Sequence, residues 1–119
     1  MKETTFTTNT CSFPSELDIS TYLIDNKTAT YFVKVQGDSM QHVGIFSGDL
    51  LIVDRSKKAS SKKIILACVN GEFTVRRLIL KENKTFLYPE NPNYNPLEIT
   101  EGMDFEIFGV VTFNIHKPL

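Results

Sequence analysis

The sequence has few of the residues that stabilise small domains through disulfides or metal ions. Its 119 residues include two cysteines, Cys11 and Cys68, and two histidines, His42 and His116. No pair of them has the short spacing of zinc ligands, so a four-ligand site would require all four to converge by chance. A chain of this length buries roughly two thirds of the surface that the unfolded chain exposes, which suffices for a core without cross-links. We therefore expect no metal or other cofactor, reduced thiols and a cytoplasmic location.

An excess of charge of one sign is also missing. Thirteen basic residues oppose fourteen acidic ones, and the isoelectric point is about 6.1. Proteins that hold nucleic acid through its phosphates carry a clear excess or stripe of lysine and arginine. No stretch reaches the roughly 18 apolar residues of a membrane-spanning helix, and the polar residues 1–10 lack the apolar centre of a signal peptide. We expect neither direct nucleic-acid binding nor a membrane location.

The composition changes along the chain and suggests an arm followed by a domain. Residues 1–15 have few large apolar side chains and contain Pro14, which predicts a flexible, extended N-terminal arm. Residues 16–119 are expected to form a single domain. Asp18 is a suitable N-cap for a short helix, and the apolar side chains that follow it lie on one face of that helix.

Beyond residue 30 the apolar residues follow the period of β-strands. Asn70-Gly71 separates two apolar segments and provides the two positive φ angles of a type I′ hairpin turn. The segment 50–53 is continuously apolar and partly β-branched, which is typical of a strand buried on both faces. The expected strands are 31–35, 50–53, 64–69, 72–80, 85–88, 97–99 and 105–115. The pattern predicts a mainly β fold, rolled into an open, barrel-like body with short helices.

The segment 37–55 contains the residues with the clearest chemical meaning. Ser39 follows Gly37 and Asp38 at the end of an expected strand and precedes residues that can form one helical turn. Such a turn exposes a hydroxyl group and can direct backbone N–H groups at a developing oxyanion, as a nucleophile requires. The alternative is that Asp38 and Ser39 only cap a turn.

This segment resembles the nucleophile motif of the LexA and UmuD family of self-cleaving serine peptidases. The matching residues are Gly37, Asp38, Ser39, Met40, Gly44, Ile45, Gly48 and Asp49. The resemblance continues through GEFTVRRL at 71–78, a proline- and asparagine-rich run at 87–96 and FGVV at 108–111, and it covers residues 11–115. The residues before the motif are closer to UmuD than to LexA. The resemblance implies the open β-barrel-type fold of the LexA/UmuD C-terminal domain, with Ser39 as the nucleophile and the other matched residues supporting its loop.

The resemblance also implies a general base, and here the sequence departs from the family. The family activates its serine with a lysine directly after the Glu-Phe-Thr-Val run, where this chain has Arg76. A buried lysine can lose its proton, whereas only about 10⁻⁷ of free guanidinium groups are neutral at neutral pH. We therefore expect a disabled dyad, in which Arg76 replaces the general-base lysine. His42, Lys62 or Lys63 could serve as a substitute base, so the enzymatic activity stays open.

The resemblance further implies a cleavage site and partners. Family members cut their own arm, and the corresponding bond in this chain is Cys11–Ser12. The implied partners are a second copy of the chain or a UmuD relative, a UmuC-type translesion DNA polymerase and the RecA filament of the SOS response to DNA damage. Three functions follow: a catalytically impaired subunit of this mutagenesis system, an active autopeptidase, or a decoy that pairs with an intact UmuD.

Overall fold

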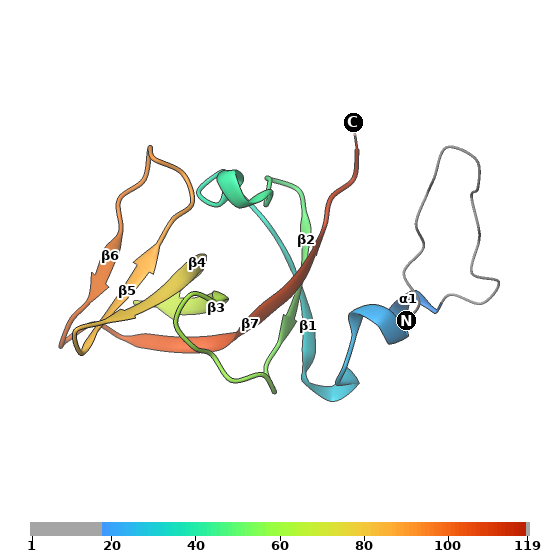
Figure 1. The fold of residues 1–119 in the computed structure, drawn as a ribbon, viewed down its shortest axis with the longest axis horizontal. Helices are drawn as coiled ribbons and strands as arrows, with labels where there is room; N and C mark the ends of the chain where they lie inside the picture. Colours follow the sequence, from blue (N-terminus) through green and yellow to red (C-terminus); the bar gives the residue numbers. More distant parts are fainter. Residues whose placement is uncertain (1–17, 119) are drawn as a thin grey trace.

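One seven-stranded antiparallel sheet forms most of the fold in the computed structural model, which describes residues 18–118 (Figure 1). The strand order is β1-β2-β7-β3-β4-β5-β6. The elements are α1 (Ile19–Leu23), the 3-10 helix η1 (Lys27–Ala29), β1 (Thr30–Lys34), the 3-10 helix η2 (Gln41–Val43), β2 (Leu50–Asp54), β3 (Ile64–Val69), β4 (Glu72–Lys81), β5 (Lys84–Tyr88), β6 (Leu97–Ile99) and β7 (Phe105–Ile115). The predicted mainly β fold is confirmed, and the predicted arm at 1–15 lies outside the described residues.

The sheet curls because its long central strand changes partners along its length. β7 pairs with β3 through its first half and with β2 through its second half (Figure 1). The register shifts once in each pairing, between Ile52 and Val53 and between Leu66 and Ala67. Such bulges bend and twist a strand. Gly109 lies in this region, where a Cβ atom would stand 2.7 Å from Cγ1 of Val53.

The hairpin between β3 and β4 has the turn that the sequence predicts. Asn70 and Gly71 have φ angles of 50° and 85°, so both central residues have the positive values of a type I′ turn. Val69 pairs with Glu72 across this turn, and the strands then continue in register to the Ile64–Arg77 pair. The turn therefore sets which residues of β4 face the interior.

Two clusters of buried side chains form the core. The first lies beneath the loop that carries Ser39 and contains Met40, Ile45, Leu51, Val53 and Leu66. The second lies between β3, β4, β5 and β7 and contains Ile65, Ala67, Leu78, Leu87 and Val110. Both clusters draw on β3, because successive residues of a strand face opposite sides.

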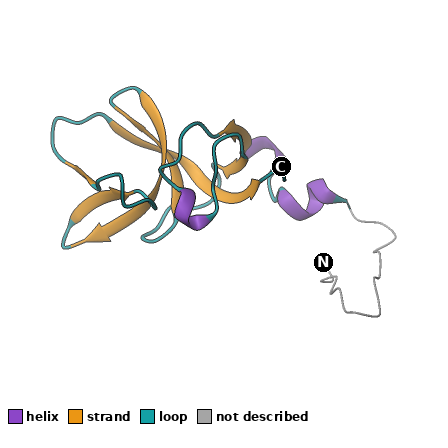
Figure 2. Ribbon diagram, turned by 90° about the horizontal axis from the view of Figure 1, so that it is seen from above, coloured by secondary structure: helices purple, strands orange, loops and turns teal. Residues whose placement is uncertain are grey.

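α1 begins where the sequence predicts, but its apolar side chains remain exposed. The carboxylate of Asp18 accepts hydrogen bonds from the backbone N–H groups of Ser20 and Thr21 and thereby caps the helix. Figure 2 shows the helical segments as short turns attached to a body of strands. Ile19 is 60% exposed. No helix within residues 18–118 is long and apolar enough to cross a membrane.

The exposed apolar residues continue from α1 onto one side of the sheet. The ring of Tyr22 lies 5.6 Å from that of Phe113, and the register places Phe113 and Phe32 on either side of Ile52. We call this surface the outer apolar face; its exposed members are Tyr22, Phe32, Leu50, Phe113 and Ile115. Phe32 is 57% exposed, which is unusual for a phenylalanine in a strand.

Candidate active site

The loop at 36–40, which we call the nucleophile loop, leaves the end of β1 in a tight turn. Gly37 has a φ angle of 90°, a value that L side chains rarely adopt, and this allows the chain to reverse directly before Ser39. The backbone N–H of Gln41 then donates to the carbonyl of Asp38 and begins η2. Ser39 is half-buried and its hydroxyl lines an open cleft.

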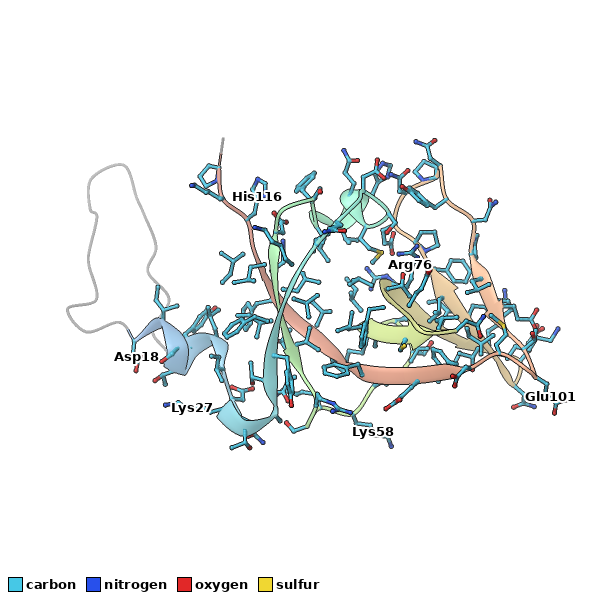
Figure 3. All side chains as sticks on the ribbon, turned by 180° about the vertical axis from the view of Figure 1, so that it is seen from behind. Asp18, Lys27, Lys58, Arg76, Glu101 and His116 are labelled. Carbon is cyan, nitrogen blue, oxygen red and sulfur yellow. The ribbon has the colours of Figure 1, made fainter. Side chains whose placement is uncertain are left out.

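Arg76 reaches this hydroxyl from β4. Its Nη1 lies 2.7 Å from Oγ of Ser39 and also 2.7 Å from the carbonyl oxygen of Val75. Figure 3 labels Arg76 at β4. A guanidinium nitrogen carries only donor N–H groups, so the serine oxygen accepts this hydrogen bond. The structure thus brings together the two residues that the sequence identifies as nucleophile and replaced base.

The surroundings of Arg76 do not turn it into a base. Burial lowers the pKa of its guanidinium from the ordinary value, and the nearby Tyr94 acts in the opposite direction. Even full burial shifts a pKa by about 3 to 5 units, which still leaves an arginine protonated at neutral pH. Arg76 therefore donates to Ser39 and takes no proton from it.

A second loop, residues 89–96, clamps the nucleophile loop from the other side. The side-chain amide of Asn91 donates to the carbonyl of Asp38 at 2.9 Å, and the Tyr94 hydroxyl donates to the Asp38 carboxylate. The backbone N–H of Glu90 donates to the carbonyl of Ser39 at 2.8 Å. The hydrogen bond to Asp38 raises the pKa of the Tyr94 hydroxyl.

The family resemblance includes this second loop but implies no role for its residues. The only signal was its density of proline and asparagine, which predicts a loop but no contact. Asn91 is 7% exposed, and its side chain makes two part-buried hydrogen bonds. Asn91 and Tyr94 hold the backbone and carboxylate directly before the nucleophile.

Asp49, which the motif includes as a supporting residue, anchors the turn between η2 and β2. Its carboxylate is 2% exposed and accepts hydrogen bonds from the backbone N–H of Phe46 and the side-chain amide of Asn114. Nδ1 of His116 lies 2.6 Å from its other oxygen. Burial by itself raises the pKa of Asp49, but these hydrogen bonds outweigh it and hold the pKa below the ordinary value.

The remaining motif residues shape the turn around Asp49. Met40 and Ile45 are buried in the core and fix the two ends of η2. Gly44 and Gly48 have φ angles of 83° and 94° and reverse the chain on either side of Phe46. The N–H of Gly48 donates to the carbonyl of Val35, which closes the turn against the end of β1.

The cleft beside Ser39 has a volume of about 330 Å³. It runs between the end of β1 and the first half of β4, and its polar end holds Ser39 and Arg76. Its apolar lining includes Val33, Val35, Leu66 and Phe73. A cleft of this shape suits an extended peptide segment, whose side chains need apolar contacts and whose carbonyl must approach the serine.

The substitute bases considered from the sequence lie away from the cleft. His42 is exposed on η2, where its backbone N–H donates to the carbonyl of Glu90. Lys62 and Lys63 are exposed before β3 and do not line the cleft. The predicted cleavage site, Cys11–Ser12, falls outside the described residues. Among residues 18–118 no three histidine, cysteine or acidic side chains are grouped to hold a metal ion.

Comparison with known proteins identifies a family for the chain. The Peptidase S24-like family matches residues 3–112. Protein SamA of Salmonella typhimurium is 47% identical over 102 residues, which is 86% of this chain and 70% of SamA. Protein ImpA of Escherichia coli is 38% identical over 113 residues, covering 86% of this chain and 69% of ImpA. Protein MucA of Escherichia coli is 41% identical over 101 residues, covering 84% and 68%.

Proposed function

Because the chain belongs to the Peptidase S24-like family and is of its LexA/UmuD type, we propose that it is a UmuD-like protein of SOS mutagenesis whose serine has lost its base. The observation that carries this proposal is the hydrogen bond of 2.7 Å from Nη1 of Arg76 to Oγ of Ser39. The guanidinium of Arg76, which faces the nucleophile, can donate hydrogen bonds but cannot accept a proton. The half-buried Ser39, its tight loop and the cleft beside it support a relation to peptidases.

The chemistry explains why this one contact is decisive. Attack of the Ser39 hydroxyl on a peptide carbonyl requires a neighbouring group to accept the hydroxyl proton. The Arg76 guanidinium has no lone pair to accept it, and its donated hydrogen bond engages one of the two lone pairs of the serine oxygen that would attack. Loss of a general base typically costs about 10²- to 10⁴-fold in rate, so intramolecular cleavage becomes very slow.

A chain without this activity acts through binding. We place it in the cytoplasm as a homodimer, or as a heterodimer with a UmuD relative, that engages a UmuC-type translesion DNA polymerase and the RecA filament. The outer apolar face supports an association with protein, because a contiguous exposed apolar surface of this kind marks an interaction site. The balanced charge supports a role that needs no direct contact with nucleic acid.

Self-cleavage tests this function directly. The purified chain is incubated with RecA, nucleotide and single-stranded DNA, and mass spectrometry follows any product that begins at Ser12. An intact UmuD relative in the same mixture serves as the positive control. We expect the relative to be processed and this chain to stay whole; a product that begins at Ser12 would refute the loss of the base.

An active peptidase is the second candidate, and the retained serine in an open cleft favours it. In that case His42 or a lysine outside the motif supplies the base, after a rearrangement that brings it to Ser39. Ser39→Ala separates the two functions. If mutagenesis in cells is lost while folding and dimerisation persist, the chain works as an enzyme; unchanged mutagenesis supports the binding role.

The binding role itself has two directions, cooperation with an intact UmuD or interference with it as a decoy. Native mass spectrometry of a mixture of the two proteins measures whether mixed dimers form. Polymerase-dependent mutagenesis, measured with and without the chain, then gives the direction. A rise indicates a cooperating subunit and a fall indicates a decoy.

A further inference from the structure

Arg76 keeps its positive charge in a half-buried position, with no acidic partner in the part of the chain that the structure describes. Within residues 18–118, the ion pairs involve Arg55, Lys57, Arg77 and His116, and none involves Arg76. Its neighbour Arg77, by contrast, is paired with Glu90 at 2.6 Å. A partly buried charge without a counterion is costly, so such a group readily binds an anion.

The hydrogen-bonding groups of Arg76 are only partly used. A guanidinium has five N–H donors, and the two on Nη1 donate to Ser39 and Val75. The three donors on Nε and Nη2 have no acceptor in the described part of the chain. Nε and Nη2 present two parallel N–H groups, the arrangement that binds a carboxylate through both oxygens.

The polar end of the cleft adds further donors. The Ser39 hydroxyl accepts from Arg76 and so keeps its own proton for donation. The backbone N–H groups of Ser39 and Met40 likewise have no acceptor among residues 18–118. The acidic group at this end is Asp38, whose carboxylate already accepts from the Tyr94 hydroxyl. A ligand here therefore meets an excess of unused donors.

The walls of the cleft indicate the kind of ligand to which the anionic group belongs. They come from the end of β1 and the first half of β4, and the apolar side chains of Val33, Val35 and Phe73 line them. Strand-lined walls with apolar side chains suit an extended peptide more than a small inorganic anion. The anion at the end of an extended peptide is its C-terminal carboxylate.

We propose that this cleft binds the free C-terminal carboxylate of an extended peptide without cleaving it, with Arg76 gripping both carboxylate oxygens and the Ser39 hydroxyl donating to one of them. The inference rests on the proposed function, because a serine that turned peptides over would not retain them. The peptide end can come from the cut arm of a paired chain or from an unrelated protein. Both sources present the same carboxylate.

The test compares two probes that differ only at this group. The first is the peptide of residues 5–11, TFTTNTC, with a free carboxylate, and the second is the same peptide with a C-terminal amide. Calorimetry under reducing conditions measures both dissociation constants with the full chain. We expect the acid to bind about 10- to 100-fold more tightly, as for other charge-assisted hydrogen bonds. Equal binding, or no binding of either at millimolar concentration, overturns the inference.

Two variants that each remove one positive charge test whether Arg76 causes the preference for the acid over the amide. Arg76→Gln should bind acid and amide alike, whereas Lys81→Gln, at the far end of β4, should keep the wild-type ratio. A preference that survives Arg76→Gln overturns the inference. A scrambled acid peptide distinguishes the sources: weaker binding indicates the arm, and equal binding indicates any peptide end.

Mass spectrometry of the same samples separates this inference from the proposed function. A chain cut at Cys11–Ser12 would refute the loss of the base, whatever the ratio of the two affinities. An intact chain that binds acid and amide equally would refute only the carboxylate site.

Discussion

Nδ1 of His116 lies 2.6 Å from Oδ1 of Asp49, although 67 positions separate the two residues in the chain. Asn114 donates to the same carboxylate and also to the carbonyl of Gly44. The segment that follows β7 is thereby tied to the turn that supports the nucleophile loop. That turn also closes on the end of β1, because the N–H of Gly48 donates to the carbonyl of Val35.

The charge of Asp49 should make the stability of the fold depend on pH. Its pKa is lower in the folded chain than in the unfolded one, so its contribution is present above the unfolded pKa and is lost as the pH falls through the folded pKa. We expect Asp49→Asn to lower the free energy of unfolding by about 1 to 3 kcal/mol at neutral pH. The difference from wild type should shrink below about pH 4.

Urea unfolding at several pH values measures this effect. Asp25→Asn is the control, because it removes an equal charge from an exposed pair with Lys57. Such surface pairs contribute about 0 to 1 kcal/mol. A gap between wild type and Asp49→Asn that is the same at acidic and neutral pH would contradict a role for the ionised carboxylate.

A lysine at position 76 should restore self-cleavage. Arg76→Lys introduces an amine that can lose its proton when partly buried, so it can accept the Ser39 proton. We expect cleavage at Cys11–Ser12 to rise by at least about 10² at alkaline pH. Gel and mass analysis of the chain over time provide the measurement.

Two variants control this gain. Arg76→Lys combined with Ser39→Ala should stay intact, and Arg77→Lys should behave as wild type because Arg77 pairs with Glu90 instead. No gain in Arg76→Lys would mean that the arm or the cleft is also unsuited to cleavage.

Asn91 should contribute more to stability than its place in a loop suggests. Asn91→Ala removes two part-buried hydrogen bonds, one to the Asp38 carbonyl and one from the Asn93 N–H. We expect a loss of about 1 to 3 kcal/mol in thermal or urea unfolding. Asn95→Ala, an exposed position in the same loop, should stay within about 0.5 kcal/mol of wild type. Equal effects of the two variants would argue against the clamp.

The close packing at Gly109 should not tolerate a methyl group. In Gly109→Ala, the new Cβ would meet Cγ1 of Val53 at 2.7 Å and the carbonyl oxygen of Asp54 at 3.1 Å, so β2 and β7 would have to separate. Overpacking of this kind costs about 1 to 3 kcal/mol. Glu106→Ala, exposed on the same strand, should stay near wild type in the same unfolding measurement. A stable Gly109→Ala would show that the bulged strands can move apart.

Features that depend on neighbouring residues could be predicted from the sequence. Asn70-Gly71 has few conformations open to it apart from a tight turn, and the structure confirms the hairpin. Asp18 caps α1 because its carboxylate reaches N–H groups only two and three positions away. The position of Ser39 opposite Arg76 was accessible only through the family resemblance, because no local pattern relates a loop to a strand 37 positions later.

Features that depend on the curl of the sheet could not be predicted. The contacts of Asn91 and Tyr94 with Asp38 span 53 and 56 positions, and they form because β5 places the loop that follows it beside the end of β1. The exposure of Ile19 and Tyr22 could not be predicted either. An apolar helix face predicts burial but does not identify the surface that would cover it.

The sequence by itself determined the chemistry at position 76, since a guanidinium holds its proton in any fold that water can reach. It also determined the turns and strands, because these depend on backbone preferences within a few residues. Only the tertiary structure decided that this guanidinium faces Ser39, has no acidic partner among residues 18–118 and borders an apolar cleft. Those relations depend on which distant strands meet when the bulged sheet closes, and no short stretch of sequence contains that information.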